Sequence, residues 1–343
     1  MSLRARCPLF GRSPTRRVRD ANASNARSVH VKASPALTTW HNALLLWSLA
    51  LHIWTSSAQT GVTLTESSFL WLDLQPESYD SATHQWNDRS NGYLDQGAGY
   101  ASTSHTNAAT YNANGYFTFD GTSNYLPLTK PELLTSHKHC AVTVGVWFRS
   151  TYSDSELSET GSNSGNWAFL DFDRSEYFNL AIGGKGQIQW STKHDSTLDD
   201  MTTTTNLNTL NDGNWHYAVG TFSDWTSEKV IYVDGLEWYR RTLSTGRGSG
   251  LGRGSTNRYG FIGDGSEATS FDGSRNNGYF LGDVALVHCY SIALTPCQVA
   301  INYKLLQPTY GSAALSSSWC VTGAKFIHCI TRAPAMDSAR RSH

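Results

Sequence analysis

The stretch NWHYAVGTFSDWTSEKVIYVDG, residues 214–235, decides the fold of this chain. It contains two runs rich in β-branched and aromatic residues, 215–222 and 229–233, joined by a short polar loop. Such runs favour strands, and the Asp234-Gly235 pair that follows is typical of a type I′ turn, which requires positive φ at both central positions. A further strand-like run, LEWYRRTL, begins at Leu236. The sequence therefore predicts an antiparallel meander of three strands.

Short strand-like runs separated by Gly, Asn, Asp and Ser continue across residues 61–311. Besides the meander they predict strands at 69–74, 115–119, 125–128, 141–149, 167–172, 178–182, 187–191, 259–262 and 280–290. Long polar loops are expected at 153–166, 194–210 and 244–256. Helical periodicity is nearly absent, which indicates an all-β sandwich or barrel.

One short helix is expected near the end of this region. Residues 295–298, Thr-Pro-Cys-Gln, form a capping box, because Thr295 can cap, Pro296 suits the first helical position and Gln298 can reach back. Val299, Tyr303 and Leu306 then repeat at helical spacing.

Residues 1–58 have the composition of a targeting segment. An Arg- and Ser-rich leader is followed by the apolar run ALLLWSLALHIW at 43–54 and by small residues that suit signal cleavage after Ala58. A run of twelve residues is short for a membrane span. We expect a secreted or cell-surface protein, with organelle import or an uncleaved anchor at 43–54 as alternatives. Residues 312–343 lack periodicity and are expected to form a tail.

The charge of the chain is unevenly distributed. The sequence has 27 Lys and Arg and 28 Asp and Glu, but residues 1–58 and 312–343 together hold 12 of the basic residues and two of the acidic ones. Residues 59–311 therefore carry 15 basic and 26 acidic side chains, a net charge of −11. An acidic body argues against a nucleic-acid partner and is compatible with Ca²⁺.

The six cysteines leave an odd number, five, once Cys7 of the leader is set aside. No Cys or His spacing is typical of a zinc site. Cys320 with Cys329 and Cys289 with Cys297 are possible pairs, whereas Cys140 and Cys289 lie in apolar runs that equally suit buried free thiols.

Several segments, taken in order, resemble the laminin-G-like or concanavalin-A-like lectin/glucanase family. The similar segments are LWLDLQPESYD…WNDRSNGYLDQG (70–97), YFTFDGTSNYLPL (116–128), AVTVGVWFR (141–149), NWHYAVGTF with IYVDG, and YFLGDVALVHCYSIALTPCQVAINYKLLQPTYG (279–311). The resemblance implies a jelly roll of two antiparallel sheets, often with Ca²⁺ near one edge. It says less about function, because this fold hosts sugar binders, adhesion modules, hydrolases and lyases.

The segment DFDRSE, residues 171–176, is the candidate for catalysis. In a strand, Asp171 and Asp173 would share a face, and a bulge would bring Glu176 beside them. The segment is similar to the Glu-x-Asp-x-x-Glu motif of glucanases with a related fold, and retaining glycosidases need two carboxylates about 5 Å apart. The alternatives are a polar ligand-binding rim that includes Arg174, and a strand end at which Arg174 pairs with a neighbouring acid.

The segment FDGSRNNGYFLGD, residues 271–283, is the candidate for cation binding. Asp272, Ser274 and Asn276 alternate and Asp283 follows, so oxygen ligands could converge on one hard cation such as Ca²⁺. The glycine position and the absence of flanking helices exclude an EF-hand. Asp88 and Asp264 are further candidate ligands, although Asp, Asn and Gly also simply make turns.

Aromatic side chains are candidates for stacking on sugars. The chain has 12 Trp and 16 Tyr, and most must be core, including Trp147 and Trp215. Trp225 and Trp238, in a loop and after a turn, are the best exposed candidates, followed by Tyr152 and Tyr177. Because Trp238 and Tyr239 are adjacent in a strand, at most one of them is expected to face the core.

Two strand histidines, His216 and His288, lack a Ser or Cys partner in a nucleophile motif, so both are predicted to be structural. Together these features predict a non-catalytic recognition module that binds carbohydrate or glycosylated partners with the help of Ca²⁺. A glycoside hydrolase or polysaccharide lyase that uses the 171–176 acids, and an adhesion module without a sugar site, are the alternatives.

Overall fold

Sixteen strands and one α-helix make up the part of the chain that the computed structural model describes, residues 62–152, 167–183, 186–194, 197–203, 210–243, 250–252 and 256–310. A short 3-10 helix, Ser67–Phe69, precedes the strands. The elements are β1 Leu70–Asp80, β2 Gln85–Asp88, β3 Tyr100–Ser102, β4 Thr110–Asn112, β5 Tyr116–Asp120, β6 Leu126–Leu133, β7 Ala141–Arg149, β8 Trp167–Asp171, β9 Phe178–Gly183, β10 Gln187–His194, β11 Thr197–Thr202, β12 Trp215–Ser223, β13 Glu228–Val233, β14 Leu236–Thr242, β15 Arg258–Ile262, β16 Leu281–Tyr290 and α2 Pro296–Tyr310.

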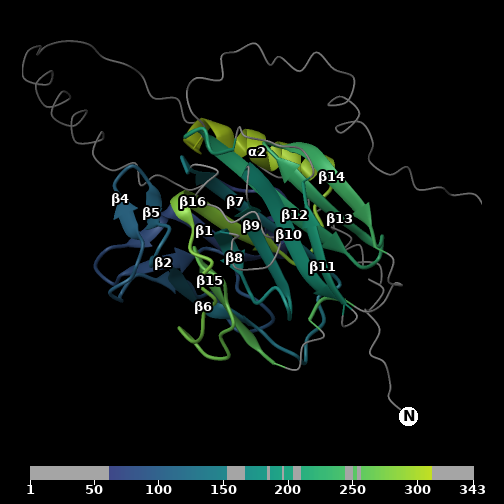
Figure 1. The fold of residues 1–343 in the computed structure, drawn as a ribbon, viewed down its shortest axis with the longest axis horizontal. Coiled ribbons are helices and arrows are strands. Elements are labelled where there is room, and N and C mark those ends of the chain that lie inside the picture. The colour runs from purple at the N-terminus through teal and green to yellow at the C-terminus, as the bar shows by residue number, and fades with distance from the viewer. Residues whose placement is uncertain are drawn as a thin grey trace, which may run out of the picture. The chain divides into compact units, whose positions relative to one another are not determined.

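The strands form two layers of antiparallel sheet (Figure 1). We call the run β14-β13-β12-β7-β16-β1-β2-β3 the first sheet, with β5 also pairing β16, and the run β11-β10-β9-β8-β15-β6 the second sheet. Among the described strands, the two runs join through β3 and β6, at the single pair Ala101 and Leu128. The predicted all-β, two-sheet, concanavalin-A-like jelly roll is confirmed.

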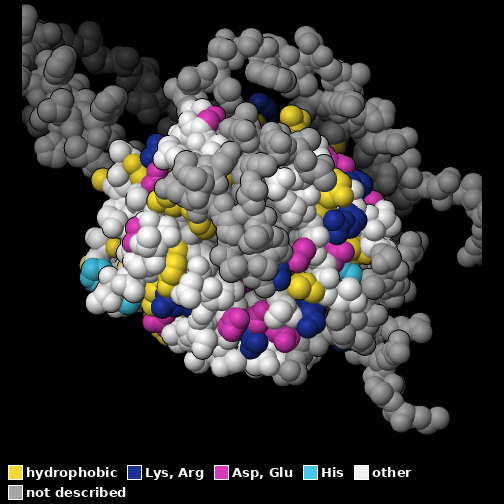
Figure 2. Space-filling view, viewed as in Figure 1, with side chains coloured by type: hydrophobic (Ala, Val, Ile, Leu, Met, Phe, Trp, Pro, Cys, Tyr) yellow, Lys and Arg dark blue, Asp and Glu magenta, His cyan; other side chains and the backbone are white. Residues whose placement is uncertain are grey.

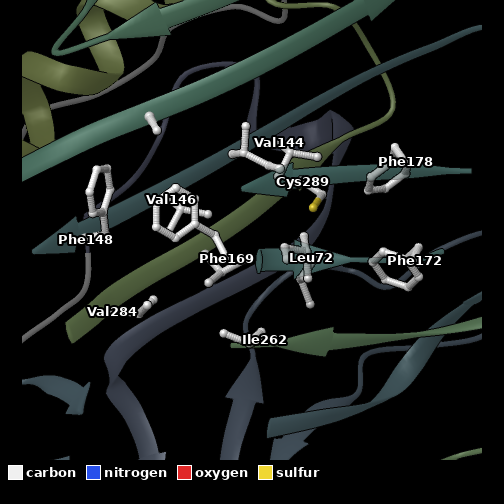
Figure 3. Close-up of a cluster of buried hydrophobic side chains, with 14 of the residues drawn as sticks. Leu72, Val144, Val146, Phe148, Phe169, Phe172, Phe178, Ile262, Val284 and Cys289 are labelled. Atoms are coloured by element: carbon white, nitrogen blue, oxygen red, sulfur yellow. The ribbon is translucent and has the colours of Figure 1, made fainter. Parts of the chain in front are cut away.

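The main core fills the space between the two sheets (Figure 3). Phe148 of β7 and Phe169 of β8 face each other with ring centroids 4.4 Å apart. Trp190 of β10 reaches across to β12, where its indole N–H donates to the Thr221 carbonyl oxygen at 3.0 Å. Apolar side chains at alternate positions of facing strands are what a sandwich core requires.

A second apolar cluster lies on the outer face of the first sheet, under α2. The Tyr303 ring packs 5.6 Å from Trp147, which is 1% exposed, as predicted for a core residue. The predicted capping box is present, because the Thr295 N–H donates to Gln298 Oε1 at 2.8 Å and the Gln298 N–H donates back to Thr295 Oγ1. Figure 1 shows the helix lying along the first sheet.

The meander predicted from residues 214–242 is formed by β12, β13 and β14. Asp234 and Gly235 have φ values of 51° and 78°, as a type I′ turn requires. A register shift follows, since Ile231 pairs with Tyr239 but Tyr232 pairs with Glu237. Because this bulge breaks the alternation, Trp238 and Tyr239 both pack against the core, contrary to the prediction that only one would.

Several predictions differ from the structure or fall outside it. Strands β2, β3, β4 and β11 were not expected, and β11 occupies part of the predicted 194–210 loop.

Cys289 is a buried free thiol, whereas Cys140 and Cys297 are each disulfide-bonded, which excludes a free Cys140 and the Cys289–Cys297 pair. The leader 1–58, the tail 312–343 and the loop 153–166 lie outside the described residues. Within the described residues, no helix has the length and apolar character needed to cross a membrane.

Candidate functional site

A polar cleft lies on the face of the second sheet that points away from the main core. Phe178, Leu180 and Ile182 of β9 and Ile188 and Trp190 of β10 belong to the core. Successive side chains of a strand point to opposite faces. The polar residues between these, Asn179, Gln189 and Ser191, therefore point outward, although they are only 7%, 5% and 0% exposed.

Asp171 joins this polar face at the end of β8. It pairs in register with Asn179 of β9, and the Asn179 amide donates to Asp171 Oδ2 at 2.9 Å. Burial raises the pKa of the Asp171 carboxyl well above its usual range, and the nearby charge of Asp173 adds to that rise. The Asn179 hydrogen bond opposes it, helped by the backbone N–H groups of Ser266 and Asp173. Asp171 is thus a buried acid that resists ionisation.

Arg174 enters the cleft from the turn between β8 and β9. Its Nη1 lies 2.8 Å from Asp200 Oδ2 of β11, and its side chain is 14% exposed. The guanidinium group is planar and rigid, so an ion pair at Nη1 also sets the direction of its other N–H groups. The predicted alternative in which Arg174 pairs with a neighbouring acid is therefore observed.

The opposite wall comes from the segment between β15 and β16. The Asn276 N–H donates to the Gly265 carbonyl oxygen at 3.0 Å. A Cβ atom on Gly265 would overlap the Asn276 side-chain amide, so glycine is what allows this amide to lie here. Further along the segment, the Ala168 N–H donates to the Gly278 carbonyl oxygen, which fastens the wall to β8.

The resulting cleft is small, with a volume of about 20 Å³ that has room for about one water molecule, and it is lined by Ala168, Asp171, Arg174, Asn179, Gln189, Gly265 and Asn276. Among the described residues, no hydrogen-bond partner is found for two buried atoms of its lining, Asp171 Oδ1 and Arg174 Nε. Buried polar groups are normally paired, so an unpaired acceptor and an unpaired donor in one cleft mark places where a ligand can bind. The cleft can therefore exchange hydrogen bonds in both directions with a polar molecule.

The three carboxylates predicted for catalysis do not converge. Strand β8 ends at Asp171, and Asp173 lies in a turn with a φ of 62°, so the two do not alternate along one strand as expected. Asp173 Oδ2 pairs with Arg258 Nε at 2.6 Å, and its Oδ1 accepts from the N–H and the hydroxyl of Ser175. Glu176 does not line the cleft. Only one acid is available there, whereas glycoside hydrolysis uses two.

The aromatic candidates lie away from the cleft. Tyr177 is 0% exposed, with its ring against Gly252, and Tyr152 is 2% exposed with Trp167 edge-on at 4.5 Å, so neither can stack on a ligand as predicted. Trp238 is partly buried against the core. Trp225 is 39% exposed and so matches the prediction of an exposed ring, but it does not line the cleft. Trp215, expected in the core, is half-buried beside Arg149.

The predicted Ca²⁺ ligands occupy separate places. Asp283 pairs with Arg149 at 2.6 Å on the first sheet, and Asp264 faces Arg275 at 3.5 Å. Asp88 accepts hydrogen bonds from the Asp73 and Ser90 N–H groups. Asp272 and Ser274 stay in the segment before β16, while Asn276 lines the cleft. No group of three or more His, Cys, Asp or Glu in the described residues suits a metal ion. The predicted ligands do not all converge on one site, and Ca²⁺ binding remains a prediction.

Asn179 and Gln189 are the cleft residues that sequence reasoning missed. Both lie within strands that were read as apolar runs, FNLAI and QIQWS. The signal was available, because a polar residue at every second position of a strand identifies a face that is not packed in the main core. Gln189 also donates to Ser191 two positions later, at 2.9 Å on the same face.

Comparison with known proteins agrees with the architecture. A laminin-G model described as the concanavalin A-like lectin/glucanases superfamily matches residues 120–300, more than half of the 343-residue chain. No curated protein matches.

Similar solved structures include the binding domain of paraclostridial mosquitocidal protein 1 (11% identity, TM-score 0.49, 69% of this chain and 52% of that one). The botulinum neurotoxin serotype D ligand binding domain in complex with N-acetylneuraminic acid is another (12%, 0.48, 72% and 52%). A third is the binding domain of botulinum neurotoxin DC in complex with rat synaptotagmin II (12%, 0.49, 70% and 52%). The chain spans about half the length of these structures.

N-acetylneuraminic acid and rat synaptotagmin II are ligands of those toxin domains. The family match covers the central strand β7, the meander, the cleft residues and the start of α2. This chain belongs to the laminin-G-like group of the concanavalin A-like lectin/glucanase superfamily.

Proposed function

We propose that this protein is a non-catalytic recognition module that binds carbohydrate, free or on a glycosylated partner, with a sugar hydroxyl group entering the polar cleft of the second sheet. The observation that carries the proposal is the pair of unpaired buried atoms, Asp171 Oδ1 and Arg174 Nε, in a cleft whose other polar side chains are amides. Sugar hydroxyls both donate and accept hydrogen bonds, so they satisfy an acceptor and a donor that lie in one cleft.

Removing one hydrogen-bonding side chain from the cleft tests the proposed carbohydrate binding. Replacing Arg174 with Ala removes the free Nε donor, and we expect glycan affinity on an array, followed by calorimetry, to fall by about tenfold or more. The matched control is Arg240→Ala, because Arg240 forms comparable ion pairs with Glu228 and Glu237 on the first sheet, outside the cleft. Equal affinities of the two variants, or no glycan binding by the wild type, would refute the proposal.

The alternative, an adhesion module without a sugar site, predicts that the wild type binds no glycan and binds a protein partner instead. The hydrolase or lyase alternative has less support, since one cleft acid stands where two are needed. Turnover of a polysaccharide that is abolished by Asp173→Asn would restore it.

Assistance by Ca²⁺ and location outside the cell or on its surface are parts of the same proposal. Repeating the array after treatment with a chelator tests the first, and a binding signal that is unchanged would remove Ca²⁺ from it. Fractionation of cells that express the full chain tests the second.

A further inference from the structure

A second pocket, larger than the polar cleft, lies on the first sheet and shares no lining residue with that cleft. Its volume is about 370 Å³, within the roughly 300–1,000 Å³ that is usual for small-molecule sites. Its walls are formed by residues of the segment 62–70, by Asp73 of β1 and by residues 89–91 after β2. We propose that this pocket, which we call the Asp73 pocket, binds a small organic amine through its protonated amino group.

Asp73 points to the outer face of the first sheet. Leu72 and Leu74, on either side of it, belong to the main core, and successive side chains of a strand point to opposite faces. Asp73 nevertheless is only 6% exposed, because the segment 62–70 passes beside it. The strand therefore places one buried acid in the wall of the pocket.

Hydrogen bonds hold both sides of the pocket. On one side, the Val62 N–H donates to Gln75 Oε1, and Gln75 Nε2 donates to the Val62 carbonyl oxygen, each at 2.8 Å. On the other side, the N–H and the hydroxyl group of Ser90 both donate to the Asp88 carboxylate at 2.9 Å. The walls thus have fixed places in the fold, which reduces the cost of ordering them when a ligand binds.

The Asp73 carboxylate has a neutral partner and no cationic one. Gln75 Nε2 donates to its two oxygens at 3.0 and 3.1 Å. Arg89 also lines the pocket, but its Nη1 pairs with Glu77 Oε1 at 2.6 Å, and no Lys, Arg or His of the described residues forms an ion pair with Asp73. A carboxylate can accept about four hydrogen bonds, so lone pairs remain for a ligand. Because buried charges are normally paired, an ammonium group in the pocket would supply the missing cation.

The Asp73 carboxyl group is mainly ionised near neutral pH. Burial raises its pKa to about 6, and the charges of Asp88 and Glu77 add to that rise, whereas the Gln75 hydrogen bond and the charge of Arg89 oppose it. Figure 2 shows acidic and basic side chains interspersed on the face in view. Exposed charges are screened by salt, so selection of a cation should depend on the buried charge of Asp73.

The rest of the lining suits an organic molecule better than a bare metal ion. Asp73 is the one acid that the described lining contains, whereas Ca²⁺ takes six to eight oxygen ligands. Leu64 and Leu70 provide apolar contacts for a carbon skeleton, and Ser67 and Ser68 provide hydroxyl groups for polar substituents. A charged group at one end and an apolar body are what this lining can recognise.

The test compares cyclohexylamine with cyclohexanol, which has the same ring and a hydroxyl group in place of the ammonium group. Each is titrated into the full chain near neutral pH, and the backbone amides of residues 62–70 and 89–91 are followed by NMR. We expect a Kd of about 1 mM for the amine, as suits a fragment of this size, and binding of the alcohol that is about tenfold weaker.

Asp73→Asn should weaken binding of the amine about tenfold and leave the alcohol unchanged. The asparagine side chain keeps an oxygen that accepts the Gln75 hydrogen bond, but it carries no charge. The matched control is Asp264→Asn, because Asp264 is also a buried acid whose pKa burial raises to about 6, and it lies outside the pocket. This control variant should bind both probes as the wild type does.

Ser68→Trp is the second variant, in case Asp73→Asn does not fold. Ser68 is an exposed residue of the pocket wall, so an indole there should block both probes with little effect on the free energy of unfolding. Equal affinity of the wild type for the two probes, or amine binding that survives either variant, would overturn the proposal. Tighter binding of Ca²⁺ alone to these residues, or no shift of their amides at about 50 mM amine, would overturn it too. None of these measurements depends on carbohydrate binding.

Discussion

Trp190 lies directly over Gly220 across the interior of the sandwich. A Cβ atom on Gly220 would be 2.5 Å from Trp190 Cδ2, too close for any real contact. The indole N–H donates to the next residue's carbonyl oxygen, on Thr221, at 3.0 Å. The glycine thus sets how closely β10 of one sheet approaches β12 of the other, and the tryptophan fills the space that the missing side chain leaves.

Gly220→Ala should therefore lower the free energy of unfolding by about 1–3 kcal/mol, because it overpacks a buried contact. Urea unfolding would measure the loss. In the Trp190→Ala background the same substitution should cost much less, since the clashing ring is gone, and a double-mutant cycle would show the coupling. Equal costs in both backgrounds would contradict the steric explanation.

Because of Lys229, the free energy of unfolding should depend on pH in the alkaline range. Its side chain is 0% exposed, and its ammonium group donates to Asp199 Oδ1 at 2.9 Å and to two backbone carbonyl oxygens. Burial lowers the pKa of Lys229 from 10.5 to about 8, and the charge of Asp199 only partly offsets this. Between these values the unfolded chain binds the proton more tightly than the native protein, so raising the pH favours folding there.

Comparing wild type with Lys229→Met isolates this contribution from that of the tyrosines. The free energy of unfolding of the wild type, minus that of the variant, should rise from about pH 8 to pH 10.5. Chemical denaturation at a series of pH values would measure it. A difference that stays constant over this range would show that Lys229 titrates normally.

His216 should have the opposite dependence near neutral pH. Its Nδ1 lies 2.9 Å from Asp234 Oδ2 and its Nε2 lies 3.3 Å from Asp212 Oδ1. Burial lowers the pKa of His216, but the two carboxylates outweigh burial and raise it above 6.5. The stability that this provides is fully present below pH 6.5 and is lost as the pH rises through the native pKa. The difference in unfolding free energy between wild type and His216→Gln should therefore fall with rising pH, and an NMR titration of the ring should give a pKa above 6.5.

The capping box of α2 offers a test of local stability. Thr295→Ala removes the side chain that accepts the Gln298 N–H, and should cost about 1 kcal/mol. Lys304→Ala, at an exposed position of the same helix, should change stability by less than about 0.5 kcal/mol. Similar losses for the two variants would mean that the cap contributes nothing specific.

Strands with clear chemical signals could be predicted from the sequence almost to the residue. Strand β7 spans Ala141–Arg149 as expected, because nine mainly apolar and β-branched residues end at a charged one. Strand β11 was missed because its sequence, TLDDMT, carries two adjacent acids, Asp199 and Asp200. Those acids are accommodated by Lys229, Arg241 and Arg174 from distant parts of the chain, which no local pattern reveals.

The candidate site was predicted only in part. Asp171, Arg174 and Asn276 were singled out for three different purposes, and the fold brings them to one cleft. Their common location depends on β8 pairing with β15, a long-range register that the sequence does not encode locally. The expected strand geometry of Asp171 and Asp173 is not formed, because the backbone of Asp173 has a positive φ and its carboxylate pairs with Arg258.

The charged contacts between β11 and the meander have a consequence for the protein in crowded solution. β11 and β14 end the strand order in the described residues, and the unpaired backbone of such strands can recruit other chains and begin aggregation. Here Lys229 and Arg241 reach from β13 and β14 to Asp199, so the two outermost strands are tied to each other. Pulling β11 away from the meander to pair it with another chain would leave the buried Lys229 without its carboxylate, a cost that opposes such pairing.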